Sequence, residues 1–313
     1  MSAETPDHSR AGSEKEAGEK RKHRPKTVID EASSLTEAEE EKVVDRLSLR
    51  APAVYAVIKE EGEAEIARPT GALFWSGLVA GIAMGFSVLT LALMQMHLPD
   101  TEWAPLVASV GYATGFLIVI LGRQQLFTEN TITVVLPLVS ERSRSALGQV
   151  ARVWSVVLIA NWIGCVVVAL GLVTFSLVPA DVSAAVLDVS QHYAELTAFT
   201  AFRQGIGAGF LIAAMVWMMP AAQGSEFVLV TATAWLIALG GFTHVIAGMV
   251  EIAALVLAGE LSVVDGLLTL TLPTLAGNVL GGTGLFTLLA YAQVKSEVDA
   301  ADPVDEPPAG PSL

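Results

Sequence analysis

Two long apolar stretches of this chain are interrupted at corresponding places, and each interruption precedes an asparagine by a similar distance. The first contains the sequence LGRQQLFTEN, in which Phe127 lies 34 residues before Asn161 of the motif NWIG. The second contains LGGFTHVIAG, in which Phe242 lies 36 residues before Asn278 of the motif NVLG. Both halves therefore carry a broken apolar span followed by an asparagine and a glycine, and this arrangement predicts a duplicated membrane pore.

Charged and apolar residues occupy different parts of the chain. Of its 313 residues 53% are hydrophobic, yet its formal net charge is −14, a combination that ordinary soluble domains do not show. No lysine occurs between Lys59 and Lys295, and that interval holds only six arginines. We therefore expect a polar cytoplasmic extension at 1–70 and a transmembrane pore domain at 71–294.

Six apolar regions are long enough to cross a membrane, which takes about 20 residues. They are approximately 71–97, 106–138, 150–178, 199–221, 226–258 and 268–294. The second and fifth are too long for one straight helix, so each is predicted to be broken. The expected fold class is an all-α membrane protein of six transmembrane helices. Its two repeats, at about 71–178 and 199–294, must be inverted because three crossings reverse the direction of the chain.

The positive charges predict the orientation. The first 70 residues carry twelve of the 18 lysines and arginines, whereas the loops after the first, third and fifth spans carry none. Those three loops instead hold seven acids, which are Asp100, Glu102, Asp181, Asp188, Glu195, Glu260 and Asp265. Both termini should therefore be cytoplasmic, in a multi-pass protein of the inner membrane.

The two ends of the chain are predicted to lie outside the bundle. Residues 1–33 are rich in charge, serine, glycine and proline, and residues 295–313 are acidic and proline-rich, so both segments are expected to be disordered. Between the N-terminal segment and the first span, a capping box at 36–39 begins a region, about 36–66, in which the sequence predicts one or two amphipathic helices.

His244 is the one histidine of five that lies inside a span. An ionised side chain at membrane depth costs about 2.5–3.5 kcal/mol on insertion scales, so such residues usually face a cavity or a partner. Histidine also changes charge near neutral pH. His244 therefore suits a proton-sensitive pore, and a satisfied hydrogen bond between helices is the alternative interpretation.

Polar residues surround the first break. Arg123, Glu129 and Asn130 form either the polar vestibule of a gate or, through Arg123 and Glu129, a structural ion pair that holds the broken helix. Near the second break, Glu251 follows His244 by seven residues and can share its helix face. For Glu251 we expect a structural role in preference to that of a proton carrier.

Asn161 and Asn278 occupy matching places in the third and sixth spans. Their amides can bond to backbone groups that the breaks leave free, so we predict that both support the helix breaks. The sequence shows no metal-ligand spacing, nucleophile motif, phosphate-binding loop or nucleic-acid surface. We therefore expect no enzyme, no cofactor, no metal site and no nucleic-acid partner.

These motifs resemble the formate/nitrite transporter family over about 225 residues, and its less characterised branch with a long cytoplasmic N-terminus in particular. The similar segments are LFT at 126–128, GF-x-H at 241–244, RVWSVVLIANWIG in the third span, MVW at 215–217 and GNVLGG at 277–282. The resemblance implies an aquaporin-like fold, a homopentamer with one pore in each protomer, and passage of small monovalent anions or their conjugate weak acids.

The resemblance also implies roles for individual residues. His244 would be the central pore residue, and the loop with Leu126, Phe127 and Thr128 would gate the cytoplasmic side. Apolar rings around the histidine would comprise Tyr112, Phe116, Leu126, Phe127 and Ile237. Better-known members carry asparagines where this chain has Gly209 and Gly248, and a lysine at the outer entrance where it has Tyr193.

The leading hypothesis is a channel or transporter for small monovalent anions or their weak acids, with His244 controlling protonation and with the N-termini of half-helices at both breaks stabilising negative charge. The outer acids would repel anions over about 8 Å, so a weak acid crosses in neutral form or the cargo is not an anion. The alternatives are a pore for a small neutral solute, and a non-conducting membrane scaffold or sensor that acts through the cytoplasmic extension.

Overall fold

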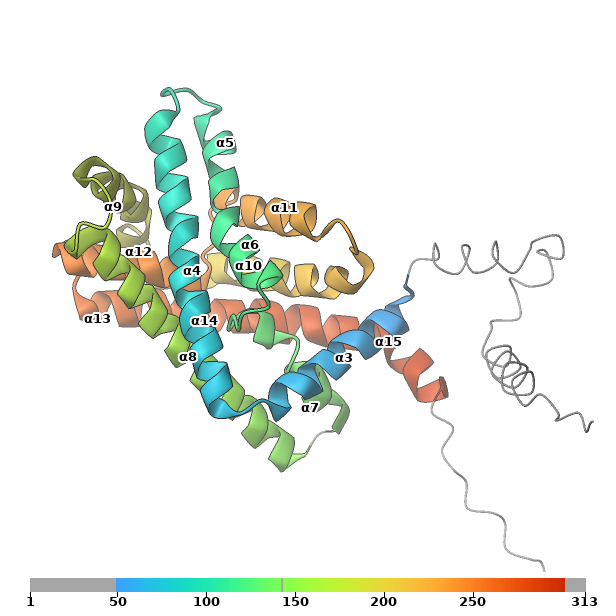
Figure 1. Cartoon of the computed structure of the whole chain (residues 1–313). Helices are drawn as coiled ribbons and strands as arrows, with labels where there is room; N and C mark the ends of the chain where they lie inside the picture. The colour runs from blue at the N-terminus through green and yellow to red at the C-terminus, as the bar shows by residue number, and fades with distance from the viewer. Residues whose placement is uncertain (1–48, 142, 302–313) are drawn as a thin grey trace, which may run out of the picture. The chain divides into compact units, whose positions relative to one another are not determined.

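The computed structural model describes residues 49–141 and 143–301, which form helices and no strand (Figure 1). The α-helices of the first half are α3 (Ala51–Ala67), α4 (Thr70–His97), α5 (Ala104–Gly111), α6 (Ala113–Leu121), α7 (Val135–Glu141), α8 (Arg144–Ala169) and α9 (Ala180–Ala194). Those of the second half are α10 (Ala198–Met218), α11 (Glu226–Leu239), α12 (Val245–Ala258), α13 (Val263–Asp265), α14 (Leu272–Val279) and α15 (Leu288–Ala301). Short 3-10 or π segments are η1 (Glu129–Thr131), η2 (Leu170–Thr174), η3 (Met219–Ala221), η4 (Gly266–Thr271) and η5 (Leu280–Thr287).

Five stretches are apolar and long enough to cross a membrane as continuous helical segments. They are Thr70–His97, Ala104–Leu121, Arg144–Thr174, Ala198–Ala221 and Val263–Val298. The remaining predicted span consists of α11 and α12, which have 14 residues each. At 1.5 Å per residue each covers about 21 Å, less than the roughly 30 Å of hydrocarbon, so only the two halves together can cross. The predicted break in the fifth span is confirmed.

The second span is also broken, but differently from the fifth. After α6 ends at Leu121, the chain runs through a loop and the three-residue η1 before α7 begins at Val135. We expected the N-terminus of a half-helix at both breaks, and this expectation is wrong for the first. The sequence TITVV at 131–135 consists of β-branched residues, which lose side-chain freedom in a helix, and it delays the next helix.

Glycines let the outer helices of each half approach closely. Gly81 of α4 lies so near to Asn161 of α8 that a Cβ atom would overlap the asparagine carbonyl oxygen. Gly209 of α10 meets the carbonyl oxygen of Asn278 in the same way. Small residues at such crossings are the usual means by which membrane helices pack without a hydrophobic driving force. The two crossings are therefore equivalent, as the predicted repeat requires.

The N-terminal helix α3 packs against α7 and α15 at one end of the bundle (Figure 1). Tyr55 lies against Tyr291 with ring centroids 5.9 Å apart, and Arg152 donates to the carbonyl oxygens of Ile66 and Arg68. The helix predicted at about 36–66 thus includes α3, while its first part and the segment predicted to be disordered at 1–33 lie outside the described residues.

The last helix is longer than predicted. A disordered tail was expected from residue 295, but α15 continues to Ala301. Val294 is buried and Val298 packs against the core, so this turn of helix is stabilised by apolar contacts that the acidic composition does not reveal. Residues 302–313 of the predicted tail lie outside the described part.

Candidate functional site

The helices that precede the two breaks, α6 and α11, end with the same backbone geometry. At the first break Arg123 has a φ of 52°, and at the second Gly241 has a φ of 63°. One residue further, Gln124 donates its amide to Val119 at 2.9 Å and Phe242 donates to Ile237 at 3.0 Å. Gly241 takes this left-handed conformation without a Cβ penalty, whereas Arg123 takes it at a cost of about 1–2 kcal/mol.

Asn161 holds the first break through its side-chain amide. Its Oδ1 accepts the backbone N–H of Phe127 at 2.9 Å, and its Nδ2 donates to the carbonyl oxygens of Gln125 at 2.9 Å and Gly77 at 2.7 Å. The asparagine is completely buried, so these backbone groups have no access to water. It therefore joins the loop to both α4 and α8.

Asn278 holds the second break in the same way. Its Oδ1 accepts the N–H of Val245 at 2.9 Å, and its Nδ2 donates to Thr243 at 2.9 Å and Gly205 at 3.0 Å. These bonds make Val245 the counterpart of Phe127, because both donate to the equivalent asparagine. The sequence comparison paired Phe127 with Phe242, and this register is wrong by three residues.

His244 lies between the two repeats, at the start of α12. Its Nδ1 accepts the N–H of Ala247 at 3.2 Å and so caps the helix. Since Nδ1 supplies a lone pair, the ring proton of the neutral imidazole is on Nε2. Nε2 lies 2.7 Å from the hydroxyl oxygen of Thr128, which therefore accepts this proton and keeps its own hydrogen for another acceptor.

This bond connects the breaks directly, since Thr128 belongs to the first repeat and His244 to the second. Both side chains are completely buried. An aromatic ladder continues from the imidazole: Phe116 packs edge-on to His244 with centroids 5.0 Å apart, and Tyr112 lies 5.6 Å from Phe116. The centre of the molecule is thus a polar pair with a mostly apolar surround.

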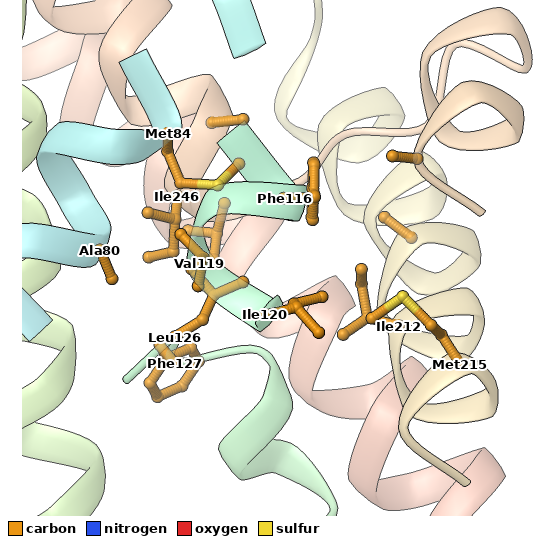
Figure 2. Packing of buried hydrophobic residues seen from close by; sticks show 14 of the residues in the cluster. Ala80, Met84, Phe116, Val119, Ile120, Leu126, Phe127, Ile212, Met215 and Ile246 are labelled. Carbon is orange, nitrogen blue, oxygen red and sulfur yellow. The ribbon is translucent and has the colours of Figure 1, made fainter. Parts of the chain in front are cut away.

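The remaining predicted ring residues belong to the same buried apolar cluster. Leu126 and Phe127 lie close to Val119 at the end of α6 (Figure 2). The ring of Phe127 packs on Trp154 of α8 at 5.6 Å, and the Trp154 indole donates to the carbonyl oxygen of Asn130 at 3.0 Å. Trp154 therefore fixes both sides of the loop. Ile237 of α11 is completely buried.

The polar residues near the first break do not form the predicted ion pair. Arg123 is exposed and pairs with Glu61 of α3 at 3.3 Å, and no ion pair joins it to Glu129. Glu129 Oε1 is buried without a hydrogen-bond partner, while Asn130 donates to Gln125 at 3.2 Å. Arg123 pairs with α3 because this helix packs against the same end of the bundle. The vestibule interpretation stays a prediction.

Beyond His244 on α12, the side chain of Tyr193 occupies the space beside Gly248. A Cβ atom at Gly248 would overlap the tyrosine hydroxyl. One turn further along the helix, Glu251 is 2% exposed and lies 3.5 Å from Nδ1 of His192. The space beside Gly248 is therefore filled by a phenol from α9. Gly209 packs against α14 and leaves no room for a side chain.

Several contributors to the site were missed in the sequence. Ser76 accepts the amide of Gln125 at 3.1 Å, the thiol of Cys165 donates to the carbonyl oxygen of Ile246 at 3.2 Å, and Glu61 pairs with Arg123. Their partners are at least 49 residues away in the chain, so no local pattern could have indicated them. Among the described residues no cluster of acids, histidines or cysteines is suited to hold a metal ion.

Comparisons with known proteins support the same fold. The chain matches the formate/nitrite transporter family over residues 52–292. It is 38% identical over 254 residues to the inner membrane protein YfdC of Escherichia coli (strain K12), covering 81% of this chain and 82% of that relative. It is 26% identical over 188 residues to the formate channel FocA of Haemophilus influenzae, covering 57% of this chain and 64% of that relative.

Two solved structures share the architecture. One is a pentameric formate channel with formate bound, with a TM-score of 0.63 and 21% identity, covering 72% of this chain and 98% of the channel. The other is an ion channel of the same family, with a TM-score of 0.65 and 21% identity, covering 78% of this chain and 98% of that one. The all-helical fold with two broken spans is thus the fold of these channels.

Proposed function

The chain belongs to the formate/nitrite transporter family, and from this premise we propose that it is a membrane channel or transporter for small monovalent anions that cross as their conjugate weak acids. Formate is the first cargo to test, because the relatives named above include formate channels. The observation that carries the proposal is the bond between His244 and Thr128, which places two polar side chains where the two broken spans meet.

The energetics favour a neutral cargo at this point. A bare carboxylate in an apolar environment costs tens of kcal/mol by a Born estimate. Protonating a carboxylate whose conjugate acid has a pKa near 4 costs only about 4 kcal/mol at pH 7, because each pH unit is worth about 1.36 kcal/mol. The protonated acid is therefore the cheaper species in the buried centre.

The half-helix α12 offers little to a bare anion. Of its first amides, Val245 donates to Asn278, Ala247 donates to His244 and Gly248 donates within the helix. The dipole at its N-terminus still favours negative charge, but most of the donors are occupied. The Thr128 hydroxyl hydrogen remains, and a single donor suits the carbonyl oxygen of a neutral acid better than a carboxylate.

We also propose the assembly and location that accompany this function. A homopentamer with one pore in each protomer, in the inner membrane and with both termini in the cytoplasm, is supported by the pentameric structural neighbour, the inner-membrane relative and the distribution of lysine and arginine. Large apolar side chains on the outside of the described bundle suit contact with lipid or with neighbouring protomers. They include Trp75, Ile159, Ile163 and Val167.

A pore for a small neutral solute is the second candidate. The residues beyond His244 favour this candidate. They include the acid Glu251 and the phenol Tyr193, and no lysine there attracts an anion. Glycerol and formamide uptake by the same vesicles would distinguish the two, since this candidate predicts solute flux without any formate flux.

The test of the proposed function compares two replacements of His244 in proteoliposomes. Both His244→Phe and His244→Asn remove the Nε2 donor, but asparagine is a good helix cap and can replace the bond to Ala247. We expect both variants to lose acid-stimulated formate uptake at least tenfold, with the asparagine variant as thermally stable as the wild type. Wild-type uptake in the His244→Asn variant would contradict the proposed role of His244.

A further inference from the structure

A buried carboxyl group lies beyond the central pair, and the mechanism above does not use it. Glu251 of α12 is 2% exposed, and its Oε2 has no hydrogen-bond partner. Taking a carboxylate out of water without such a partner costs several kcal/mol. A packing role alone does not account for this group, because an apolar side chain of similar size would avoid the cost.

Among the described residues, the side chain at ion-pair distance from Glu251 is an imidazole that reaches solvent. His192, in the last turn of α9, places Nδ1 3.5 Å from Glu251 Oε2, and its side chain is 54% exposed. The same Nδ1 lies 2.8 Å from the carbonyl oxygen of Val189, which can only accept, so Nδ1 carries a hydrogen. Nε2 has no partner among the described residues and is free to exchange protons with water.

Glu251 lies on the same side of α12 as the central histidine. It follows Gly248 by three residues and His244 by seven, so the three share one helix face. Tyr193 fills the space at Gly248, and the aromatic ladder from His244 through Phe116 ends at Tyr112. Tyr193 also packs on His192, with ring centroids 4.6 Å apart. The carboxyl group therefore stands at the outer end of the column that leads to His244.

Within the described part of the chain, no lysine or arginine lies at ion-pair distance from Glu251. Among the elements that pack on α12, the segments η2, η4 and α14 contain no ionisable residue, and α4 contains only His97, at its end. Helix α8 carries the buried thiol of Cys165 together with Arg144 and Arg152, and Arg152 donates to the carbonyl oxygens of Ile66 and Arg68. Helix α9 carries Asp181, Asp188, His192 and Tyr193, and of the groups on these two helices only His192 lies at ion-pair distance from Glu251. His192 is thus the group that can bring a proton to Glu251, and protonation is the means by which this site loses or gains charge.

We propose that Glu251 is the proton-exchange carboxyl of the outer pore, which protonates the cargo before it reaches His244, and that His192 relays the proton from solvent. This inference rests on the proposed function and gives it a specificity-determining residue. In the structure Glu251 is buried, its Oε2 accepts no hydrogen bond, and the same oxygen lies 3.5 Å from the imidazole of His192, which reaches solvent.

The transfer balances in three steps. A proton from solvent binds Nε2 of His192, and the proton on Nδ1 leaves the carbonyl oxygen of Val189 and passes to Oε2 of Glu251. The carboxylic acid then gives its proton to the cargo carboxylate, which leaves toward Thr128 as a neutral acid. Glu251 is again a carboxylate, and the imidazole returns to its first tautomer when Nε2 releases a proton to water and Nδ1 takes one up.

The experiment measures the initial rate of formate uptake by proteoliposomes at external pH values from 5 to 8, with empty liposomes subtracted. The variants are Glu251→Gln, which keeps the shape and removes the titration, and His192→Gln at an exposed position. The matched control is Glu260→Gln, an exposed acid that bonds to Gln191 on the same side of the molecule. Pentamer formation is checked by size-exclusion chromatography with light scattering.

We expect the wild type and Glu260→Gln to transport faster as the pH falls. Glu251→Gln should reduce the rate at pH 5 at least tenfold and vary less than twofold across the series. His192→Gln should move the midpoint of the profile by at least one pH unit toward acid while keeping the maximal rate. If Glu251→Gln fails to assemble, the profile of His192→Gln decides, because its side chain is exposed.

Two results would overturn the inference. One is wild-type profiles in both Glu251→Gln and His192→Gln. The other is a profile of unchanged shape at a lower rate, as expected if the pair only supports the fold. Either result leaves the proposed function intact when the wild type transports formate. No formate uptake by the wild type would instead overturn the proposed function, and this inference with it.

Discussion

The replacement of Asn278 by leucine tests how the second break is held. Leucine has nearly the same shape but can neither accept the N–H of Val245 nor donate to Thr243 and Gly205. Gly205 lies within α10, where its carbonyl keeps its helical bond, so two backbone groups are left without partners. At about 1–3 kcal/mol for each unsatisfied buried group, the loss is about 2–6 kcal/mol.

The assay is thermal unfolding of the purified protein in detergent, followed by circular dichroism. One kcal/mol corresponds to about 2–4 °C for a domain of this size, so the Tm should fall by at least about 4 °C. Asn161→Leu is the matched variant, since Asn161 makes the equivalent three bonds, and it should fall by a similar amount. A Tm within 1 °C of the wild type in both variants would refute the assignment of these asparagines as supports of the breaks.

Three further predictions concern single residues. Gly209→Ala should lower the Tm by several degrees because the added Cβ would overlap Asn278, whereas Gly148→Ala in α8, where nothing lies within 4 Å, should leave the Tm unchanged or raise it slightly. Equal effects of the two variants in thermal unfolding would contradict the close helix crossing. Gly241→Ala should lower the free energy of unfolding by about 1–2 kcal/mol because the φ of Gly241 is 63°, whereas Arg123→Gly should lower it by less than about 1 kcal/mol, because removing the arginine's left-handed backbone strain offsets the loss of its exposed ion pair. If thermal unfolding shows Arg123→Gly to be the more damaging variant, the ion pair dominates. Thr128→Val, which removes the hydroxyl and keeps the shape, should reduce formate uptake at least tenfold and lower the Tm by at least about 2 °C, because the buried Nε2–H of His244 loses its acceptor. Unaltered uptake in proteoliposomes would exclude Thr128 from the pathway.

The fold could be predicted from the sequence because its main constraints are local. Apolar length sets the spans, and the interruptions near Leu126 and His244 lie in apolar regions where backbone groups must still be satisfied. For the same reason Asn161 and Asn278 were expected to bond to the breaks. The register of Phe127 against Phe242 was nevertheless wrong, because the hydrogen bonds to the two asparagines make Val245 the counterpart of Phe127.

The contacts between distant segments could not be predicted. The Thr128–His244 bond joins residues 116 positions apart, and the partner of Arg123 is Glu61 on a helix that packs against the bundle from outside it. The neighbour of Glu251 also comes from another element, since His192 belongs to α9. Each of these pairs depends on how helices pack in three dimensions, and helical periodicity indicates only which residues share a face.

The central claim is that the cargo crosses as a neutral acid. The dependence of formate accumulation on membrane potential tests this claim most directly. Proteoliposomes loaded with potassium and treated with valinomycin can be set to about 100 mV, which is worth about 2.3 kcal/mol for a unit charge. An anion would then change its equilibrium distribution about 50-fold. We predict that formate accumulation follows the pH gradient and does not change with the potential, whereas accumulation that follows the potential at constant pH would contradict the account.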